Sequence, residues 1–363
     1  MRVPPAGESA NATTGGLSAK KARGIRRIPD PVRESSPAAI ADPDKGGAVT
    51  PPDWYSQWLG ASEAVGRRQV FFVLGCQKSG TTWLQHLLNA HPALCCDAEG
   101  HLLDLLAPAI QQVVTIYNQR QSQRPPARRA LLSDRDLLGI VKMLGDQILA
   151  GYLAACEDPR AIRAVGDKTP EHAVNVDVLS QIYPQARFIH IIRDGRDACI
   201  SGWFHLQRQG KAEQFATLAA YADYFAEHHW VRYITAARGA AAGMPERYLE
   251  MRYESLHADP AGETRGMLRF LQVDASEEVV AACVEAASFE KLAGGRARGQ
   301  EDASSFFRKG VVGDWQRHFD EAAIVSFHRK AGELLQELGY SPAGIDPAFG
   351  GASRSETGMS AVP

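Results

Sequence analysis

The chain lacks a strong charge of either sign. Its 40 Lys and Arg and 42 Asp and Glu side chains leave a formal net charge of −2 over 363 residues. That balance argues against a nucleic-acid partner bound through bulk charge, so any basic site must be local. Hydrophobic residues make up 45% and charged residues 23%, as in soluble globular proteins. No apolar run approaches membrane-spanning length, and we expect no membrane span.

The cysteines and histidines do not occur at the spacings of known redox or metal motifs. The six cysteines include no C-x-x-C pair, and Cys95 and Cys96 are adjacent, which is a poor geometry for a bridge. We therefore expect free thiols and a reducing compartment. The eleven histidines include no H-E-x-x-H segment, so no metal site is predicted. The N-terminal region lacks the apolar core of a secretory signal, which favours a cytoplasmic location.

Strand and helix patterns alternate through the middle of the chain. Strands are predicted at 70–74, 163–165, 187–192 and 248–251. Helices are predicted from 81, over 129–157 with Ser133 and Asp136 at a capped start, from near 194, and over 214–238, 260–271, 277–287 and 321–338. Strands separated by helices predict an α/β fold, a single three-layer domain with a central parallel sheet flanked by helices.

This domain is expected to occupy residues 54–345. Residues 1–53 are rich in Pro, Ala, Gly and Ser, show no period, and are predicted to be a disordered tail. Residues 346–363 are predicted to be a second disordered tail. No internal repeat is present, so one domain accounts for the ordered part of the chain.

The most informative segment joins a buried strand to a helix. An apolar run ends at Gly75, and Gly80 precedes a segment with helix-like apolar spacing. A strand, a glycine-containing loop and a helix start form the arrangement that cradles phosphate in P-loop proteins. An ATP-type loop would have lysine at the position of Thr81, whereas here Lys78 lies inside the loop. A cation at that position meets a phosphate from a different side.

A second strand, turn and helix predicts another anion site. Arg193 ends a buried strand just before Gly195, and Ser201 follows about two turns into the next helix. Ligands of such folds gather at the carboxyl ends of the strands. An arginine fork with a hydroxyl suits a terminal phosphate. The alternative is that Arg193 forms an ion pair with Asp194 or Asp197.

The first loop resembles a known family. It resembles the 5′-phosphosulfate loop of sulfotransferases that use 3′-phosphoadenosine 5′-phosphosulfate (PAPS) and release 3′-phosphoadenosine 5′-phosphate (PAP), through Gln77, Lys78, Ser79, Gly80, Thr81, Thr82 and Trp83. The resemblance implies a P-loop NTPase-like sulfotransferase fold. It also implies that Arg193 and Ser201 hold the 3′-phosphate of the donor. It extends from about Phe71 to Gly339.

Three later segments match the same family. Residues 308–315 resemble its Arg-Lys-Gly-x-x-Gly-Asp-Trp signature, in which Arg308, Lys309 and Gly310 would close over the 3′-phosphate. Tyr253 lies in a segment that resembles Tyr-Glu-Asp, whose tyrosine reaches the adenine. The segment that begins Ser288-Phe289 resembles Ser-Phe-x-x-Leu/Met, whose phenylalanine packs on the adenine, and Trp83 would stack there too. Taken singly, these aromatics could be core residues and the basic pair a solvated surface feature.

Different groups of this family use different catalytic bases. Cytosolic sulfotransferases use the histidine of a Lys-Thr-His segment, and this chain has Pro170 at that place. The segment before Glu99 resembles that of tyrosylprotein sulfotransferases, which use a glutamate, so we expect Glu99 to be the base. His172 and His101 are the alternatives. Lys168 is expected to support the sulfuryl group or the base.

The acceptor is less well specified. Its pocket is expected to come from residues 100–159 and 203–210, and the arginine-rich segment 118–129 is either a basic lid for an anionic acceptor or a solvated loop. We expect transfer to a hydroxyl or amine of a small molecule, glycan or lipid by a monomer or homodimer. Two alternatives remain: a P-loop kinase or NTPase, and a non-catalytic PAP-binding protein on the same fold.

Overall fold

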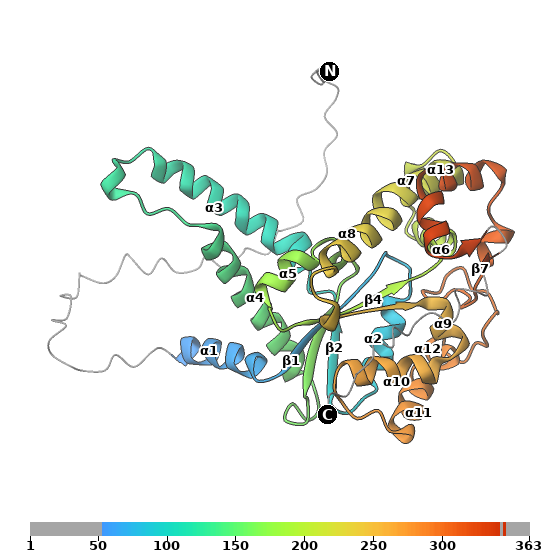
Figure 1. Ribbon diagram of the computed structural model, residues 1–363, viewed down its shortest axis with the longest axis horizontal. Coiled ribbons are helices and arrows are strands. Elements are labelled where there is room, and N and C mark those ends of the chain that lie inside the picture. The colour runs from blue at the N-terminus through green and yellow to red at the C-terminus, as the bar shows by residue number, and fades with distance from the viewer. Residues whose placement is uncertain (1–52, 342–343, 346–363) are drawn as a thin grey trace, which may run out of the picture. The chain divides into compact units, whose positions relative to one another are not determined.

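A parallel sheet of five strands forms the centre of the protein. The computed structural model describes residues 53–341 and 344–345. The strand order is β2-β3-β1-β4-β5, and every neighbouring pair is parallel. The strands are β1 (Gln69–Leu74), β2 (Leu94–Ala98), β3 (Ala164–Lys168), β4 (Arg187–Ile192) and β5 (Tyr248–Arg252) (Figure 1). The predicted α/β fold with a central parallel sheet is confirmed.

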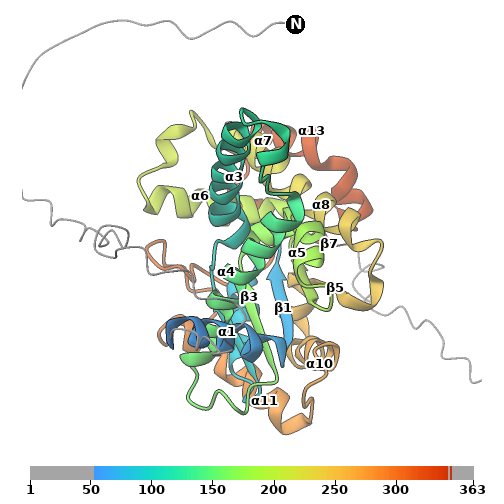
Figure 2. The same cartoon turned by 90° about the vertical axis from the view of Figure 1, so that its left-hand side faces the viewer.

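The two faces of the sheet bury two separate apolar cores. Along β1, Phe72 and Leu74 belong to one core and Phe71 and Val73 to the other, because successive side chains of a strand point to opposite faces. The first core is completed by α4 (Asp134–Ala154), α5 (Val176–Ile182), α6 (Gly195–Arg208), α7 (Leu218–Phe225), α8 (Arg232–Ala241) and α13 (Glu321–Glu337). The second is completed by α2 (Thr81–Asn89), α9 (Tyr253–Ala258), α10 (Pro260–Phe270) and α11 (Glu277–Ala286). Helices therefore cover both faces, as predicted (Figure 2).

The remaining elements are short or lie at the margins of these layers. They are the helices α1 (Asp53–Gly66), α3 (Ala107–Ser122) and α12 (Phe289–Leu292), and the two-stranded pair β6 (Tyr340–Ser341) and β7 (Gly344–Ile345). Two short segments are π-helical: η1 (Leu102–Leu106) and η5 (Ala226–Val231). The 3₁₀-helices are η2 (Pro126–Arg128), η3 (Pro170–Val174), η4 (Ala212–Gln214), η6 (Pro245–Arg247) and η7 (Asp314–Arg317).

Local sequence signals set several helix boundaries. The Ser133 hydroxyl accepts a hydrogen bond from the Asp136 N–H at 3.3 Å, and the Asp136 carboxylate accepts one from the Ser133 N–H at 2.8 Å. This capping box starts α4, and the predicted helix 129–157 is accordingly shorter. The helix predicted over 214–238 begins later than predicted, at Leu218, where Thr217 is its N-cap. It then continues through α7, the π-helical segment η5 and α8, because the residues at both junctions keep helical backbone angles.

The ends of the predicted domain can be compared only in part. The predicted tails, 1–53 and 346–363, lie outside the described residues except for Asp53, which begins α1. Within the described part of the chain, α4 is the one helix whose length and mean hydropathy, 1.4, would suit a membrane span. α4 packs against α1, α5 and β3. We therefore treat α4 as a helix of the domain.

Candidate functional site

The loop between β1 and α2 is held close to its neighbours. Gly75 has φ +156°, and a Cβ there would lie 2.5 Å from the Ile191 carbonyl oxygen on β4. Gly80 has φ +105°, and a Cβ there would lie 2.7 Å from the Tyr253 ring. Lys78 is itself left-handed, with φ +70°. The two glycines are therefore needed for the close approach of the loop to β4 and to Tyr253.

A cavity of about 320 Å³ lies at the carboxyl ends of the strands. Lys78, Glu99, Pro170, Arg193 and Tyr253 follow the five strands in turn, and all of them line it. Its other predicted residues are Gln77, Gly80, Thr81, Thr82, Trp83, Ser201, Phe289, Arg308, Lys309 and Gly310. Segments distant in the sequence thus meet at one edge of the sheet, the edge where ligands of open α/β sheets bind.

Arg193 connects the two predicted anion sites. Its Nη1 donates to the Lys78 carbonyl at 3.2 Å, and its Nη2 donates to the Val311 carbonyl at 3.1 Å. The guanidinium lies 4.3 Å from the centre of the Tyr253 ring and 3.7 Å from the Asp197 carboxylate. Its Nε is buried and has no hydrogen-bond partner among the described residues. Of the two alternative partners, Asp197 is therefore close, whereas Asp194 pairs with Arg196 at 2.7 Å.

Lys78 is a cation in an unfavourable environment. Burial, followed by the positive charges of Arg208, Arg193 and Lys168, lowers its pKa to about 8. Its Nζ lies 4.3 Å from the centre of the Phe306 ring. An anion in the cavity would relieve both the desolvation and the repulsion.

The basic pair of residues 308–315 also lines the cavity, but in contact with carboxylates. Arg308 forms ion pairs with Glu301 and Asp314. Lys309 Nζ lies 2.6 Å from Asp314 Oδ1 and 3.5 Å from Glu301 Oε2. A phosphate bound here would share these two cations with Asp314 and Glu301.

Aromatic side chains form the far end of the cavity. The Trp83 and Tyr253 rings meet edge-on with centroids 5.7 Å apart, and Arg298 lies 5.4 Å from the Trp83 ring centre. Phe289 packs so closely on Gly310 that a Cβ there would approach its ring to 2.4 Å. A second hollow, of about 370 Å³, shares Trp83, Phe289 and Arg298 with the first. These flat faces suit a purine base.

Two predicted nucleotide residues lie outside the lining of the main cavity. Ser288 lines the second hollow, and its hydroxyl caps α12 by accepting from the Lys291 N–H at 3.4 Å. Ser79 is fully buried within the loop, where its N–H donates to the Cys76 carbonyl at 3.1 Å. Both side chains are therefore placed to support the walls of the cavity.

Glu99 and Lys168 form an ion pair at the edge of the cavity. Glu99 Oε1 lies 2.6 Å from Lys168 Nζ, and Glu99 Oε2 lies 3.8 Å from His101 Nε2. The Lys168 side chain is 5% exposed and that of Glu99 is 39% exposed. Glu99 lines the cavity, whereas Lys168 is buried behind it and contacts the Glu99 carboxylate at this edge.

The two alternative bases occupy different surroundings. His172 is buried, does not line the cavity, and its Nε2 lies 2.7 Å from Asp167 Oδ1. His101 is partly exposed, and its hydrogen bond with Asp104, 2.7 Å long, raises its pKa. Neither histidine lines the cavity that contains Lys78 and Glu99.

Asp167 is a site residue that sequence reasoning did not assign. Its carboxylate accepts hydrogen bonds from the Gly100 N–H at 2.8 Å, the Tyr152 hydroxyl at 2.8 Å and the Thr169 hydroxyl at 2.6 Å, besides its contact with His172. Burial alone would raise its pKa, but these contacts lower it to about 2. Asp167 thus fixes the backbone that carries Glu99 beside the strand that carries Lys168. In the sequence, only its position directly before Lys168 indicates that Asp167 lies near the site.

Other cavity neighbours were also missed. Arg298 lines the cavity and lies over Trp83. His205 also lines it, and its Nδ1 lies 2.6 Å from Nη2 of Arg208, one turn further along α6. By contrast, none of the arginines of segment 118–129 lines the cavity. Among residues 53–341 and 344–345, no group of three or more His, Cys, Asp or Glu side chains could hold a metal ion; the absence of a metal requirement stays a prediction.

Comparison with known proteins identifies the family. A family model described as the Sulfotransferase family matches residues 70–277, which is more than half of the chain. The chain belongs to this family. It is 31% identical over 125 residues to the nodulation protein NoeE of Sinorhizobium fredii, a match covering 34% of this chain and 29% of NoeE. It is 25% identical over 217 residues to protein-tyrosine sulfotransferase 1 of Danio rerio, covering 58% of this chain and 55% of that protein.

A solved structure adds a distant likeness. Mouse sulfotransferase SULT7A1 complexed with PAP has 19% sequence identity and a TM-score of 0.48, with 77% of this chain and 89% of that chain covered. The chain spans about half or less of the length of the two curated relatives described above. Their full activities and substrates therefore bear on this chain only as proposals.

Proposed function

We propose that the protein is a PAPS-dependent sulfotransferase that transfers a sulfuryl group to a hydroxyl or amine of an acceptor. The observation that carries the proposal is the hydrogen bond from Arg193 to the Lys78 carbonyl at 3.2 Å. It supports one ligand for both predicted anion sites, because the residues predicted for each line the same cavity. A nucleotide with phosphate groups at two positions is the ligand that would need both.

The lining residues fit such a donor. Lys78, Thr81 and Thr82, with the amides at the start of α2, would hold the 5′-phosphosulfate. Arg193, Ser201, Arg308, Lys309 and the Gly310 N–H would hold the 3′-phosphate, and the buried, unpaired Arg193 Nε supports an anion there. Trp83, Tyr253 and Phe289 would enclose the adenine.

Transfer would proceed by in-line attack. The acceptor oxygen or nitrogen forms a bond to sulfur while the bond from sulfur to the 5′-phosphate oxygen breaks, and PAP leaves with that electron pair. Because charge grows on the leaving phosphate, the fixed charge of Lys78 lowers the barrier. Lys168, 2.6 Å from Glu99, is placed to orient that carboxylate.

Glu99 is the base that we propose. It lines the cavity and is partly exposed, so its Oε2, which lies 3.8 Å from His101 Nε2, can accept the acceptor proton. His172 is buried against Asp167 and would need to move to reach the same proton. His101 is close to Glu99 but does not line the cavity.

The proposal also covers the acceptor, the location and the oligomeric state. We propose a small-molecule, glycan or lipid acceptor, a cytoplasmic location, and a monomer or homodimer. A kinase or NTPase would need a lysine at the position of Thr81, which is buried at the start of α2. A PAP-binding protein without activity differs from our proposal only in turnover.

The proposal is tested by calorimetric titration of the full chain with PAP, ATP and ADP in the absence of metal. We expect PAP to bind at least about tenfold more tightly than either, because only PAP has a 3′-phosphate. Preference for ATP would favour the kinase alternative. Turnover is then measured with labelled PAPS and a panel of hydroxyl and amine acceptors, and transfer to none of a broad panel would favour the non-catalytic alternative.

A further inference from the structure

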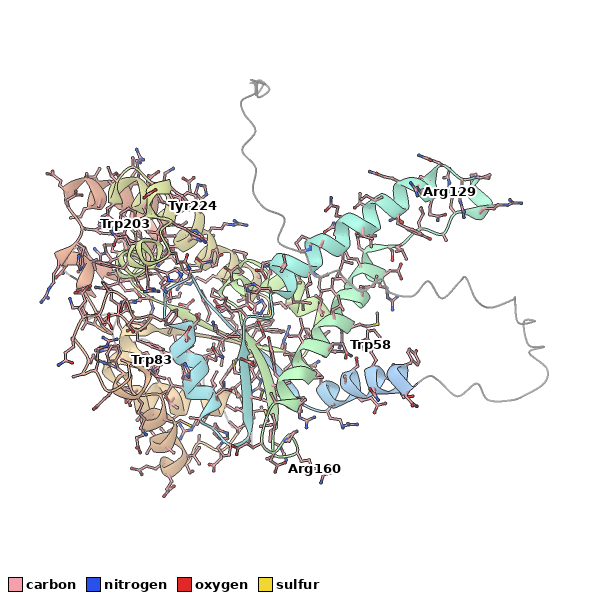
Figure 3. All side chains as sticks on the ribbon, turned by 180° about the vertical axis from the view of Figure 1, so that it is seen from behind. Trp58, Trp83, Arg129, Arg160, Trp203 and Tyr224 are labelled. Atoms are coloured by element: carbon pink, nitrogen blue, oxygen red, sulfur yellow. The ribbon has the colours of Figure 1, made fainter. Side chains whose placement is uncertain are left out.

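Helix α3 presents a surface that the site does not use. It packs on α4 and on the turn η1, and none of its residues is buried. Asn118 of α3 forms two hydrogen bonds, of 2.7 and 2.9 Å, with the backbone of Leu132 in the segment that leads from α3 to α4. Figure 3 shows Arg129 at the end of the α3–α4 pair, far from Trp83 in the cavity. This pair is therefore unlike an active-site lid.

One stripe of α3 is apolar and then basic. Val113, Ile116 and Tyr117 are 66%, 56% and 37% exposed, Arg120 continues the same helical spacing, and Arg124 follows just beyond the end of the helix at Ser122. We call these five residues the α3 stripe. Such a stripe lies on one side of a helix, separate from the side that packs on α4.

The other exposed side of α3 has a different composition. It holds Gln111, Gln112, Thr115, Gln119 and Ser122, all of them exposed and uncharged. Apolar and basic side chains are thus segregated from neutral polar ones around the same helix. A merely solvated helix has no need of that segregation.

The charge near the stripe is mostly of one sign. Arg128 and Arg129 follow in the turn after α3, and Leu131, 53% exposed, extends the apolar surface. Within the described residues, none of the arginines at 120, 124, 128 and 129 forms an ion pair. Unpaired cations beside exposed apolar side chains call for an anionic, partly apolar occupant.

We propose that the α3 stripe docks on the surface of a lipid bilayer that contains anionic lipids. Val113, Ile116 and Tyr117 enter the interface between headgroups and acyl chains, while Arg120 and Arg124 contact the lipid phosphates. A second copy of this chain fits less well, because an antiparallel contact about a two-fold axis would set the arginines of one stripe against the apolar side chains of the other. The contact needs no membrane-spanning helix.

The test is flotation of the full chain with vesicles. We expect binding to vesicles of phosphatidylcholine mixed with phosphatidylglycerol, little binding to phosphatidylcholine alone, and loss of binding as salt rises, since salt screens surface charge. The double variant Arg120→Gln/Arg124→Gln should weaken vesicle binding about tenfold or more. The double variant Val113→Ser/Ile116→Ser should weaken it to a similar degree, while circular dichroism checks that the fold is kept.

A matched control makes the same change in net charge on the neutral side of the helix. The double variant Gln112→Glu/Gln119→Glu changes the net charge by the same amount on the neutral side of α3 and should retain vesicle binding. Equal loss in this control would overturn the proposal, because bulk charge would then explain binding. Equal binding to neutral vesicles, or sedimentation showing a lipid-free dimer that the Val113→Ser/Ile116→Ser variant abolishes, would overturn it too.

Discussion

Arg193 donates a hydrogen bond from Nη1 to the backbone carbonyl of Lys78, across 3.2 Å. The donor follows β4 and the acceptor follows β1, and these strands are neighbours in the sheet. Arg193, which is predicted to bind the 3′-phosphate, thus also contacts the loop that is predicted to bind the 5′-phosphosulfate. A substitution at either residue is therefore expected to act on the binding of one nucleotide.

The charge of Lys78 predicts how PAP affinity depends on pH. Its pKa is about 8 in the unliganded protein, lowered by burial and by neighbouring cations. A bound bisphosphate stabilises the protonated form and so raises this pKa. PAP affinity should therefore be steady below about pH 7 and fall as pH rises through about 8, approaching tenfold per pH unit. Calorimetry in buffers of different ionisation enthalpy should show proton uptake on binding in the upper range.

Lys78→Arg provides the control for this prediction. An arginine stays charged throughout, so its PAP affinity should be nearly flat over the same pH range. If the variant and the unmodified protein show the same pH dependence, another group is responsible for it.

Glu99→Gln is expected to separate binding from chemistry. The amide cannot take the acceptor proton, so turnover should fall about 10²- to 10⁴-fold while PAP affinity changes little. Glu171→Gln is the matched control, because Glu171 lines the same cavity and accepts from Gln77 at 2.5 Å. It should lose far less activity. Near-normal turnover in Glu99→Gln would move the role to a histidine.

Asp167→Asn is expected to impair turnover without touching the nucleotide. The amide cannot accept from Gly100, Tyr152 and Thr169 as the carboxylate does, so the backbone carrying Glu99 would lose its anchor. We expect kcat to fall at least about tenfold with PAP affinity retained. Tyr152→Phe removes one of these bonds and should have a smaller effect. A loss explained wholly by unfolding, seen as an equal loss of PAP binding, would contradict a positioning role.

Glu254 predicts a pH dependence of stability. Burial raises its pKa from 4.5 to about 7, although its carboxylate accepts from the Asp194 N–H at 2.9 Å. Since the folded pKa is the higher one, the stabilisation is complete below about 4.5 and is lost as pH rises through about 7. Glu254→Gln does not titrate, so the Tm of this variant relative to the unmodified protein should rise between about pH 5 and pH 8. A constant Tm difference would show that Glu254 does not titrate in this range.

The sequence was informative where chemistry and local pattern coincide. The strand, glycine loop and helix around Lys78, and the capping box at Ser133, are continuous segments whose backbone demands can be read directly. Strand β2 was not predicted because it lies at the edge of the sheet, pairs only with β3, and ends in exposed polar residues such as Asp97. Helix α3 was not predicted because no buried face imposes a period on it.

Residues that act through distant partners could not be found in this way. Asp167 gains its role from Tyr152 on α4 and from the backbone after β2, which only the folded sheet brings together. Arg298 lies over Trp83 although the two are far apart in the sequence. The helix predicted over 214–238 does continue through η5, but its apolar period did not reveal the change of hydrogen-bond pattern in that segment.

If neighbouring anion sites hold two ends of one nucleotide, removal of one phosphate must weaken binding. Calorimetry of PAP and of adenosine 5′-monophosphate, which lacks the 3′-phosphate, is compared for the unmodified protein and for Arg193→Met. We predict that PAP binds far more tightly to the unmodified protein, and that Arg193→Met weakens PAP about 10- to 100-fold but weakens the monophosphate, which loses only the support of the Lys78 carbonyl, much less. Equal affinities for the two nucleotides, or an equal loss of both in the variant, would contradict the account.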